Sequence, residues 1–172
     1  HDVTCVAGVT TIPAPEWLPL VLSCPTPEAM LTECKALTND RIDAWVHAAA
    51  VLDYVVENPA EGKLASQQGT LTLPLVEGAK HIMELKDACA SAVRIGFKLE
   101  SGVKQTDLIH RAYAQIQKAD MTAVIANRLE DLGHLDKPRG YLVDGQGAHF
   151  VLNDAKDLHE AVQTIIERGT EA

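Results

Sequence analysis

The sequence predicts an α/β fold with three layers, in which helices cover both faces of a mostly parallel sheet that ends in an antiparallel hairpin. Strand-like and helix-like segments alternate along the chain, as in proteins whose parallel strands are joined by crossover helices. Residues 44–50 form an apolar run without alternation, which suits a strand buried on both faces of such a sheet. Near the C-terminus, residues 144–147 (Asp-Gly-Gln-Gly) separate two short apolar runs and predict a hairpin turn.

The first half of the chain predicts strands at residues 2–7 and 17–23, which a proline-broken loop separates. Thr26 suits the N-cap of the next helix and Pro27 its first turn, and this helix is expected to run to about residue 37. The buried strand 44–50 follows. A polar loop over residues 58–68 leads to residues 69–76, whose alternation at Leu71, Leu73 and Leu75 predicts an exposed strand or hairpin arm.

The second half predicts an amphipathic helix at residues 80–91, a buried strand at 93–97 and a helix at 106–118. The last of these helices carries its apolar side chains at helical spacing, at Leu108, Ile109, Ala112 and Ile116. A strand is expected at residues 122–126, and the hairpin arms at 140–143 and 149–152. Asn153 or Asp154 is expected to cap a final helix that runs to about residue 168.

Composition narrows the class of protein. A chain of 172 residues that is 47% hydrophobic can bury one sizeable core, and no apolar run has the length that spans a bilayer. The net charge of −9 argues against nonspecific nucleic-acid binding. The chain starts at His1, directly before a predicted strand, which suggests a fragment or a processed chain.

The cysteines and glycines exclude several kinds of site. The four cysteines form no Cys-x-x-Cys pair, and Cys5 and Cys89 lie in apolar runs, as expected for reduced core residues of a cytoplasmic protein. The histidines show no paired metal spacing. The segment Gly145-Gln146-Gly147 lies between two strands and lacks a third glycine, so a hairpin turn is favoured over a dinucleotide site.

The run at residues 48–54 (Ala-Ala-Ala-Val-Leu-Asp-Tyr) is followed by two charged residues that suit a binding site. Asp53 stands at the end of the run, and Lys63 follows ten residues later. In open α/β sheets, ligands bind at the carboxyl ends of strands, so both are candidate site residues. Spacing alone leaves open the structural alternatives of a capping Asp53 and a solvated Lys63.

Other candidates also have structural alternatives. Phe97 stands at a strand end, where an aromatic ring belongs to the core or stacks on a base. Asn127 follows a strand and by default is a turn residue. Arg111 and Lys118 lie seven residues apart on a predicted helix, so they can share one face, as a basic site or as a solvated stripe.

Together these segments resemble phosphopantothenate–cysteine ligase (phosphopantothenoylcysteine synthetase), the ligase half of the bifunctional coenzyme A biosynthesis flavoprotein. The family's Ala-Ala-Ala-Val-x-Asp-(Tyr/Trp) strand end is matched by residues 48–54, and its lysine-rich motif by residues 63–66 (Lys-Leu-Ala-Ser). A Gly/Ser-Phe segment and a strand ending in Ala-Asn are matched at residues 96–97 and 126–127. Residues 97–100 (Phe-Lys-Leu-Glu) are similar to eukaryotic and archaeal members more than to the bacterial Phe-Ala-Ala-Glu form.

The resemblance implies a single Rossmann-like ligase domain over residues 1–172 and a reaction in two steps. The carboxylate of 4′-phosphopantothenate is expected to attack the α-phosphate of CTP or ATP with release of pyrophosphate, and the amine of L-cysteine then attacks the acyl-nucleotide. Both steps bring negative charges together, so cations aimed at the phosphates are needed, and Mg²⁺ shares that task. The family is dimeric, and the loop and hairpin over residues 58–76 are expected to join the protomers.

The resemblance also implies which residues bind the nucleotide. Lys63 is expected to contact the triphosphate as the catalytic lysine, Asp53 to help hold the nucleotide, and Phe97 to pack against the base or ribose. The other nucleotide-binding positions that the resemblance implies are His47, Ala48, Ala49, Lys80, Arg111 and Lys118.

The chain departs from the family pattern in ways that favour a second interpretation. Ala65 and Ser66 replace later lysines of the motif. The family's first strand, phosphate loop and helix would precede His1, so the chain is expected to lack this N-terminal strand–loop–helix. The second interpretation is a catalytically incomplete Rossmann-like nucleotide-binding or scaffolding subunit. An NAD(P)-dependent oxidoreductase is disfavoured because no glycine fingerprint is present.

Overall fold

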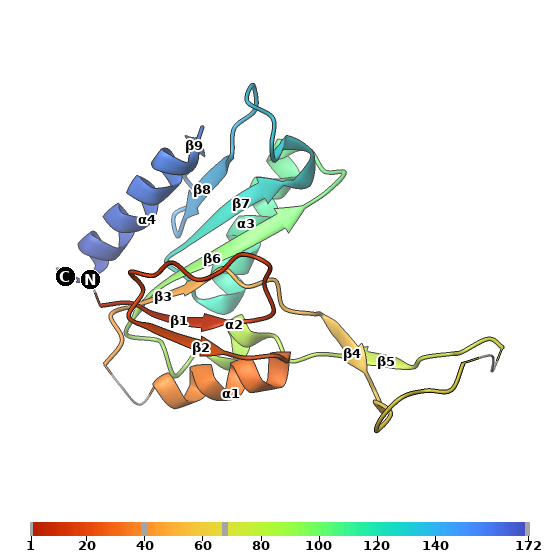
Figure 1. The fold of residues 1–172 in the computed structure, drawn as a ribbon. Helices are drawn as coiled ribbons and strands as arrows, with labels where there is room; N and C mark the ends of the chain where they lie inside the picture. Colours follow the sequence, from red (N-terminus) through yellow and green to blue (C-terminus); the bar gives the residue numbers. More distant parts are fainter. Residues whose placement is uncertain (1, 39–40, 67–68, 171–172) are drawn as a thin grey trace. The chain divides into compact units, whose positions relative to one another are not determined.

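The computed structural model describes residues 2–38, 41–66 and 69–170, which form two compact units (Figure 1). Unit 1 comprises His1–Glu33 and Ala49–Glu84, and unit 2 comprises Cys34–Ala48 and Leu85–Ala172. The predicted loop over residues 58–68 and the predicted domain of residues 1–172 both include positions that lie outside the described residues. The single ligase-like domain stays a prediction.

Unit 1 begins with a two-stranded parallel sheet and the start of a helix. Strands β1 (Thr4–Ala7) and β2 (Leu20–Ser23) pair in parallel with Thr4 opposite Leu20. Helix α1 (Pro27–Leu37) starts as its N-cap predicts, because the Thr26 hydroxyl oxygen accepts the N–H of Ala29 at 3.2 Å. Both strands and the helix confirm the sequence prediction.

The rest of unit 1 is less regular than predicted. Strand β4 (Tyr54–Val56) pairs in antiparallel fashion with β5 (Leu75–Glu77), and α2 (His81–Glu84) follows. The predicted exposed strand or hairpin arm over residues 69–76 forms only at its end, because β4 offers β5 three partner residues, and the prediction is wrong for the rest of that range. The prediction of a helix over residues 80–91 is also wrong beyond residue 84, where turns that include i→i+3 hydrogen bonds replace the helix.

Unit 2 is built on a five-stranded mixed sheet in the order β3-β6-β7-β8-β9. The strands are β3 (Ala44–His47), β6 (Val93–Glu100), β7 (Ala123–Arg128), β8 (Gly140–Asp144) and β9 (His149–Leu152). Strand β6 pairs in parallel with β3 and β7, whereas β8 and β9 form the predicted antiparallel hairpin. Strand β3 is shorter than the predicted 44–50, because the N–H of Ala48 turns back to the carbonyl of Val46 at 3.2 Å.

Two helices cover opposite faces of this sheet and give the predicted αβα layering (Figure 1). Helix α4 (Ala155–Thr170) packs on a buried cluster that includes Val93 and Ile95 of β6. Helix α3 (Gln105–Ala119) covers the face to which the alternate residues of β6 point, since Arg94 bonds to the end of α3 and a Cβ at Gly96 would meet Gln115 at 3.0 Å. The mixed sheet with helices on both faces confirms the α/β fold class.

Candidate functional site

Polar side chains gather where the parallel strands β6 and β7 end. Leu99 lies opposite Asn127 and Glu100 lies opposite Arg128, so the last pairs of the ladder bring amide and charged groups to one edge of the sheet. The carboxyl ends of parallel strands are where α/β proteins bind ligands. This edge of unit 2 is the candidate functional site.

Glu100 is the centre of a group of charged side chains on the α3 face of β6, called here the Glu100 cluster. Its carboxylate lies 3.0 Å from Nζ of Lys98 and 2.7 Å from Nη1 of Arg111. The side chain of Glu100 is 17% exposed, whereas those of Lys98 and Arg111 are 33% and 53% exposed. The hydrogen bond from Lys98, supported by Arg111, lowers the pKa of Glu100 below its ordinary value. Two cations share one carboxylate, so the cluster carries one net positive charge.

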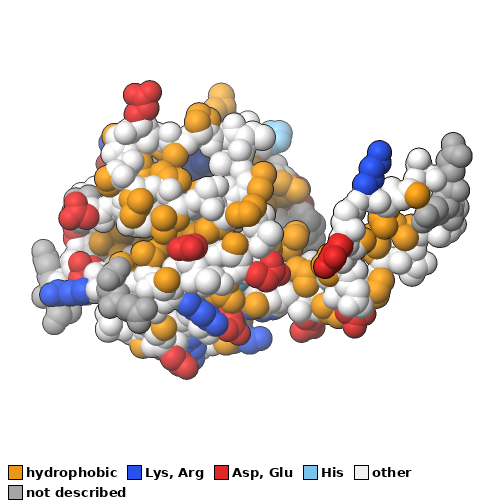
Figure 2. Space-filling view, turned by 60° about the horizontal axis from the view of Figure 1, so that its bottom comes forward, with side chains coloured by type: hydrophobic (Ala, Val, Ile, Leu, Met, Phe, Trp, Pro, Cys, Tyr) orange, Lys and Arg blue, Asp and Glu red, His pale blue; other side chains and the backbone are white. Residues whose placement is uncertain are grey.

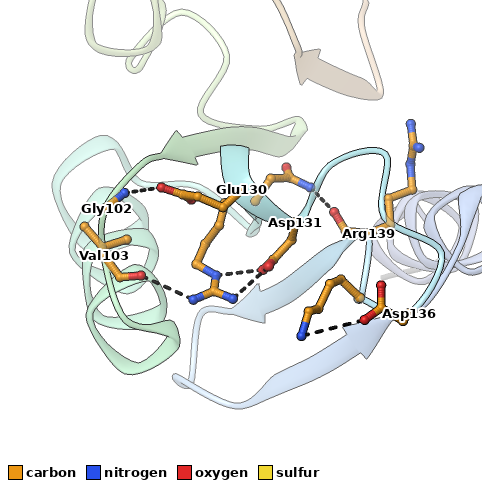
Figure 3. A network of polar contacts seen from close by, with 9 residues as sticks. Gly102, Val103, Glu130, Asp131, Asp136 and Arg139 are labelled. Carbon is orange, nitrogen blue, oxygen red and sulfur yellow. Dashed lines mark hydrogen bonds and ion pairs between the residues drawn. The ribbon is translucent and has the colours of Figure 1, made fainter.

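Arg128 ties the loop after β6 to the segment after β7 through hydrogen bonds to Val103 and Asp131, both labelled in Figure 3. Its Nε and Nη2 donate to the two carboxylate oxygens of Asp131 at 2.7 and 2.8 Å, and its Nη1 donates to the carbonyl of Val103 at 3.4 Å. The carboxylate of Glu130, next to Asp131 in the 3-10 helix η1 (Leu129–Asp131), accepts the N–H of Gly102. Asp131 is only 5% exposed, and a bidentate pair with so little solvent has a fixed geometry. The loop between β6 and α3 is thereby held in place.

Asn127 uses its side chain to hold the start of β8. Its Nδ2 donates to the carbonyl of Arg139 at 2.5 Å. A Cβ on Gly140 would lie 2.5 Å from that Nδ2 and 2.9 Å from the carbonyl oxygen of Ala126. Gly140 therefore has no room for a side chain, a constraint that spacing in the sequence does not reveal.

Phe97 lies in β6 on the α4 face. The ring is partly buried and packs against the core cluster of unit 2, which agrees with the interpretation of Phe97 as a core residue. The carbonyl oxygen of Phe97 accepts a hydrogen bond from Nε2 of Gln115 on α3 at 3.4 Å. A contact of the ring with a base stays a prediction.

Arg111 and Lys118 lie at opposite ends of the α3–β6 contact. Arg111 reaches Glu100 at the carboxyl end of β6. Lys118 is in the last turn of α3, beside Ala119, whose carbonyl accepts a hydrogen bond from Arg94 near the start of β6. Seven residues of helix are about 10 Å long. Of these two predicted residues, the structure places Arg111 at the candidate edge.

Unit 1 holds Asp53, Lys63 and Lys80. The carboxylate of Asp53 lies 4.0 Å from Nζ of Lys80, and the two side chains are 75% and 58% exposed. The backbone carbonyl of Asp53 also accepts the N–H of Gly78 at 2.8 Å, beside the β4–β5 ladder. This bond brings Asp53 close to Lys80, which follows Gly78 by two residues. Lys63 is exposed in an irregular segment, and it has no ion-pair partner among the residues that the structure describes.

The remaining predicted residues follow one another at the end of β3. His47 is the last residue of the strand, and its ring stacks on that of Trp45 with 6.2 Å between the centroids. Ala48 and Ala49 are exposed beyond the strand end. Ala48 belongs to unit 2 and Ala49 to unit 1, so the boundary between the units falls within this motif.

A cavity of about 190 Å³ lies in unit 1. It is smaller than the pockets that usually hold drug-sized ligands, about 300–1,000 Å³. The residues that line it come from the start of α1 and from the region of β4 and α2: Pro27, Glu28, Leu31, Thr32, Val55, Gly78, Ala79 and His81.

Several other kinds of site find no support in the described part of the chain. No group of three or more His, Cys, Asp or Glu residues there has the arrangement of a metal site. Among the described helices, none combines the length and apolar character that crossing a bilayer requires. None of the four cysteines forms a disulfide in the structure, and burial raises the pKa of the thiols of Cys24 and Cys89, which keeps them protonated and unreactive.

The fold and the polar carboxyl edge of its sheet define an α/β protein of the Rossmann-like class. More narrowly, the chain belongs to the family of the DNA/pantothenate metabolism flavoprotein C-terminal domain, whose family model matches residues 1–168. The match extends over both units, so the family is shown for nearly the whole chain.

Relatives and a solved structure agree with this family. The coenzyme A biosynthesis bifunctional protein CoaBC of Thermococcus kodakarensis is 32% identical over 133 residues, which are 77% of this chain and 32% of that protein. The CoaBC of Methanocaldococcus jannaschii is 36% identical over 104 residues, 60% of this chain and 25% of that protein. The chain thus spans about a third or less of these relatives. The DNA/pantothenate metabolism flavoprotein of Streptococcus pneumoniae, 20% identical, has the same fold, with a TM-score of 0.78 over 95% of this chain and 81% of that one.

Proposed function

We propose that the chain is the ligase part of a coenzyme A biosynthesis enzyme, which joins 4′-phosphopantothenate to L-cysteine at the expense of CTP or ATP. The observation that carries this proposal is the match of the flavoprotein C-terminal domain family to residues 1–168. Similarity to two CoaBC proteins supports it, as does the order of the motifs at residues 48–54, 63–66, 96–97 and 126–127.

In the proposed reaction, the carboxylate of 4′-phosphopantothenate attacks the α-phosphorus of the nucleotide. An acyl–oxygen–phosphorus bond forms, and the bond to the leaving pyrophosphate breaks. The amine of L-cysteine then attacks the acyl carbon, forms the amide, loses a proton and expels the nucleoside monophosphate. Charge builds on the phosphate oxygens in the first step, so lysine and arginine side chains near them lower its barrier.

Individual residues have proposed roles in this reaction. Lys63 contacts the triphosphate, Asp53 and Lys80 help hold the nucleotide, and Phe97 packs against its base or ribose. The exposure of Asp53, Lys63 and Lys80 leaves them accessible to a ligand. The other proposed nucleotide contacts are the backbone of His47, Ala48 and Ala49 and the side chains of Arg111 and Lys118.

Mg²⁺ is proposed to enter with the nucleotide. The described residues form no cluster of carboxylates that could hold the ion by themselves. Mg²⁺ commonly keeps several waters and binds substrate phosphates together with one or two carboxylates. A site without a cluster of carboxylates is therefore compatible with Mg²⁺ that is bound mainly by the phosphates. When bound, the ion would neutralise charge on the phosphates, and the lysines and arginine would position them.

The enzyme is further proposed to be a cytoplasmic dimer, joined through the segment that includes β4 and β5. This segment exposes large apolar side chains, including Tyr54 (57%), Leu71 (60%), Leu73 (53%) and Leu75 (56%). Figure 2 shows hydrophobic side chains on the surface of this segment, at the right of the view. A two-stranded ladder is seldom stable alone in water, so a second protomer would stabilise it. The absence of disulfides among the four cysteines, three of which are buried, fits a reducing compartment.

The proposal predicts that CTP or ATP, with Mg²⁺, raises the melting temperature of the protein. A ligand at a hundred times its Kd adds about 2.7 kcal/mol to the free energy of unfolding, which is a shift of roughly 5–10 °C for a chain of this size. Lys63→Ala is expected to abolish the shift, measured by differential scanning fluorimetry with each nucleotide in turn.

Lys156→Ala is the matched control, since this lysine is also exposed and, within the described part of the chain, its ion pair is with Glu160 on α4, at 3.4 Å. It is expected to keep the full shift. If neither nucleotide stabilises the wild-type protein, the ligase proposal is wrong for this chain. Nucleotide binding without formation of pyrophosphate would instead favour the catalytically incomplete subunit, an alternative that the replacement of motif lysines by Ala65 and Ser66 supports.

A further inference from the structure

The Glu100 cluster has more cationic hydrogen-bond donors than its own contacts use. Lys98 carries three N–H donors and Arg111 carries five. Each makes one short contact to the carboxylate of Glu100, Lys98 at 3.0 Å and Arg111 at 2.7 Å. Both cations are partly exposed, whereas Glu100 is mostly covered. Toward the residues that the structure describes, the remaining donors have no further contact, so they are available to an anion from solvent.

The position of the cluster favours a ligand over a solvated surface pair. Positions 98 and 100 alternate along β6, so both side chains lie on the α3 face at the carboxyl end of a parallel strand. Arg111 comes to the same carboxylate from the second turn of α3. The loop that joins β6 to α3 is fixed by Arg128 through Val103 (Figure 3). Lys98 is therefore held by strand β6 and Arg111 by helix α3, and the loop between these two elements is fixed.

The number of cations at this edge supports the same conclusion. A triphosphate that reacts at its α-phosphorus needs several cations. Lys98 and Arg111 supply two of them on one carboxylate of unit 2.

We propose that Lys98 is a phosphate-binding residue for the nucleotide and that Glu100 is a positioning residue, which holds Lys98 and Arg111 at the separation the phosphates require. The proposal rests on the nucleotide-dependent activity proposed above. The carboxylate of Glu100 cancels one of the two positive charges of the site, but it also fixes the side chains of Lys98 and Arg111 before the ligand binds. Pre-ordering of this kind reduces the entropy lost on binding.

The test is isothermal titration of the full-length protein with CTP, ATP, CMP and AMP. Lys98→Met is expected to weaken the affinity for the preferred triphosphate about tenfold, the size of one lost charged hydrogen bond, and to change the affinity for the monophosphate much less. Lys98→Arg is expected to restore most of the triphosphate affinity. Lys156→Met, which removes a paired lysine from α4, is the matched control and is expected to bind as the wild type does.

Glu100→Gln separates positioning from simple charge. If Glu100 only subtracted charge, its neutralisation would tighten triphosphate binding, whereas a positioning residue predicts weaker binding by severalfold. Tighter binding by Glu100→Gln, or wild-type affinity in Lys98→Met, would overturn the inference while leaving the ligase proposal intact. A wild-type protein that binds no triphosphate would overturn both. The melting temperature of each variant without ligand verifies that it is folded, and Lys98→Gln replaces Lys98→Met if that variant is not.

Discussion

Gly140 shows how a single residue without a side chain sets the geometry of the candidate edge. A Cβ at this position would meet Nδ2 of Asn127 at 2.5 Å and the carbonyl oxygen of Ala126 at 2.9 Å. The backbone oxygen cannot move without disturbing the β7–β8 ladder, so Gly140→Ala is expected to destabilise the protein by about 1–3 kcal/mol. This corresponds to a fall in melting temperature of roughly 2–12 °C, measured by calorimetry.

Gly145→Ala is the matched control for Gly140. Its nearest non-neighbouring atom to an added Cβ is the carbonyl oxygen of Thr122 at 3.9 Å, which is ordinary contact, and its φ is not positive. Its effect is expected to stay within about 0.5 kcal/mol. Equal effects of the two substitutions would show that crowding at Asn127 is not what requires a glycine at position 140.

Residue-level chemistry was predictable from the sequence only where the contact is local. Thr26, for example, caps the helix that directly follows it, as predicted. Lys98 and Glu100 share one face of β6, but they lie beyond the predicted strand of residues 93–97, because β6 continues to Glu100. The contact of Arg111 with Glu100 depends on how α3 is rotated on the sheet, and that of Asp53 with Lys80 depends on the pairing of β4 with β5. No local pattern in the sequence encodes either arrangement.

Among the elements, α4 depends on its N-cap. The carboxylate oxygen Oδ1 of Asp154 accepts the N–H groups of Lys156 and Asp157 at 2.8 and 2.9 Å. Asp154→Ala leaves these donors without a partner at the start of the helix that covers one face of the sheet. The expected loss of stability is about 1 kcal/mol, within 0.5–2 kcal/mol, measured by urea denaturation.

Asp136→Ala serves as the control for this cap, since Asp136 is an exposed loop carboxylate whose ion-pair partner among the described residues is its neighbour Lys137, at 3.9 Å. It is expected to change stability by less than about 0.5 kcal/mol. Asp154→Asn is expected to retain most of the wild-type stability, because asparagine is as good an N-cap as aspartate. A loss with Asp154→Asn as large as with Asp154→Ala would mean that charge, and not capping, is the source.

Helices with an N-cap or a clear apolar periodicity were predicted well, whereas the segments at residues 69–76 and 80–91 were not. Helices α1, α3 and α4 lie within a few residues of their predicted bounds. In residues 80–91 the apolar spacing identifies buried positions such as Leu85 and Cys89, but the chain uses turns there after residue 84. Likewise, the leucine alternation at 69–76 describes exposure correctly, whereas strand formation needs a partner of equal length.

At the scale of the whole molecule, strand–helix alternation predicted the layered sheet of unit 2 but not the division into two units. Alternation shows that parallel strands exist without showing which of them pair. In the described residues, β1 and β2 pair with each other, and β3 joins β6 in a separate sheet. The order of strands in a sheet is set by contacts between segments far apart in the sequence, which a local pattern does not contain.

The proposed dimer gives a prediction for the whole assembly. If the segment that includes β4 and β5 joins two protomers, the wild-type protein has twice the protomer mass by light scattering at micromolar concentration. Leu75→Glu places a charge in that interface, and a symmetric interface contains each substitution twice. Two buried leucines contribute at least about 3 kcal/mol, so the dissociation constant is expected to rise by at least about a hundredfold and the variant to be monomeric. Leu135→Glu, at a fully exposed position of the loop before β8, is expected to leave the dimer unchanged, and a monomeric wild-type protein would contradict the proposal.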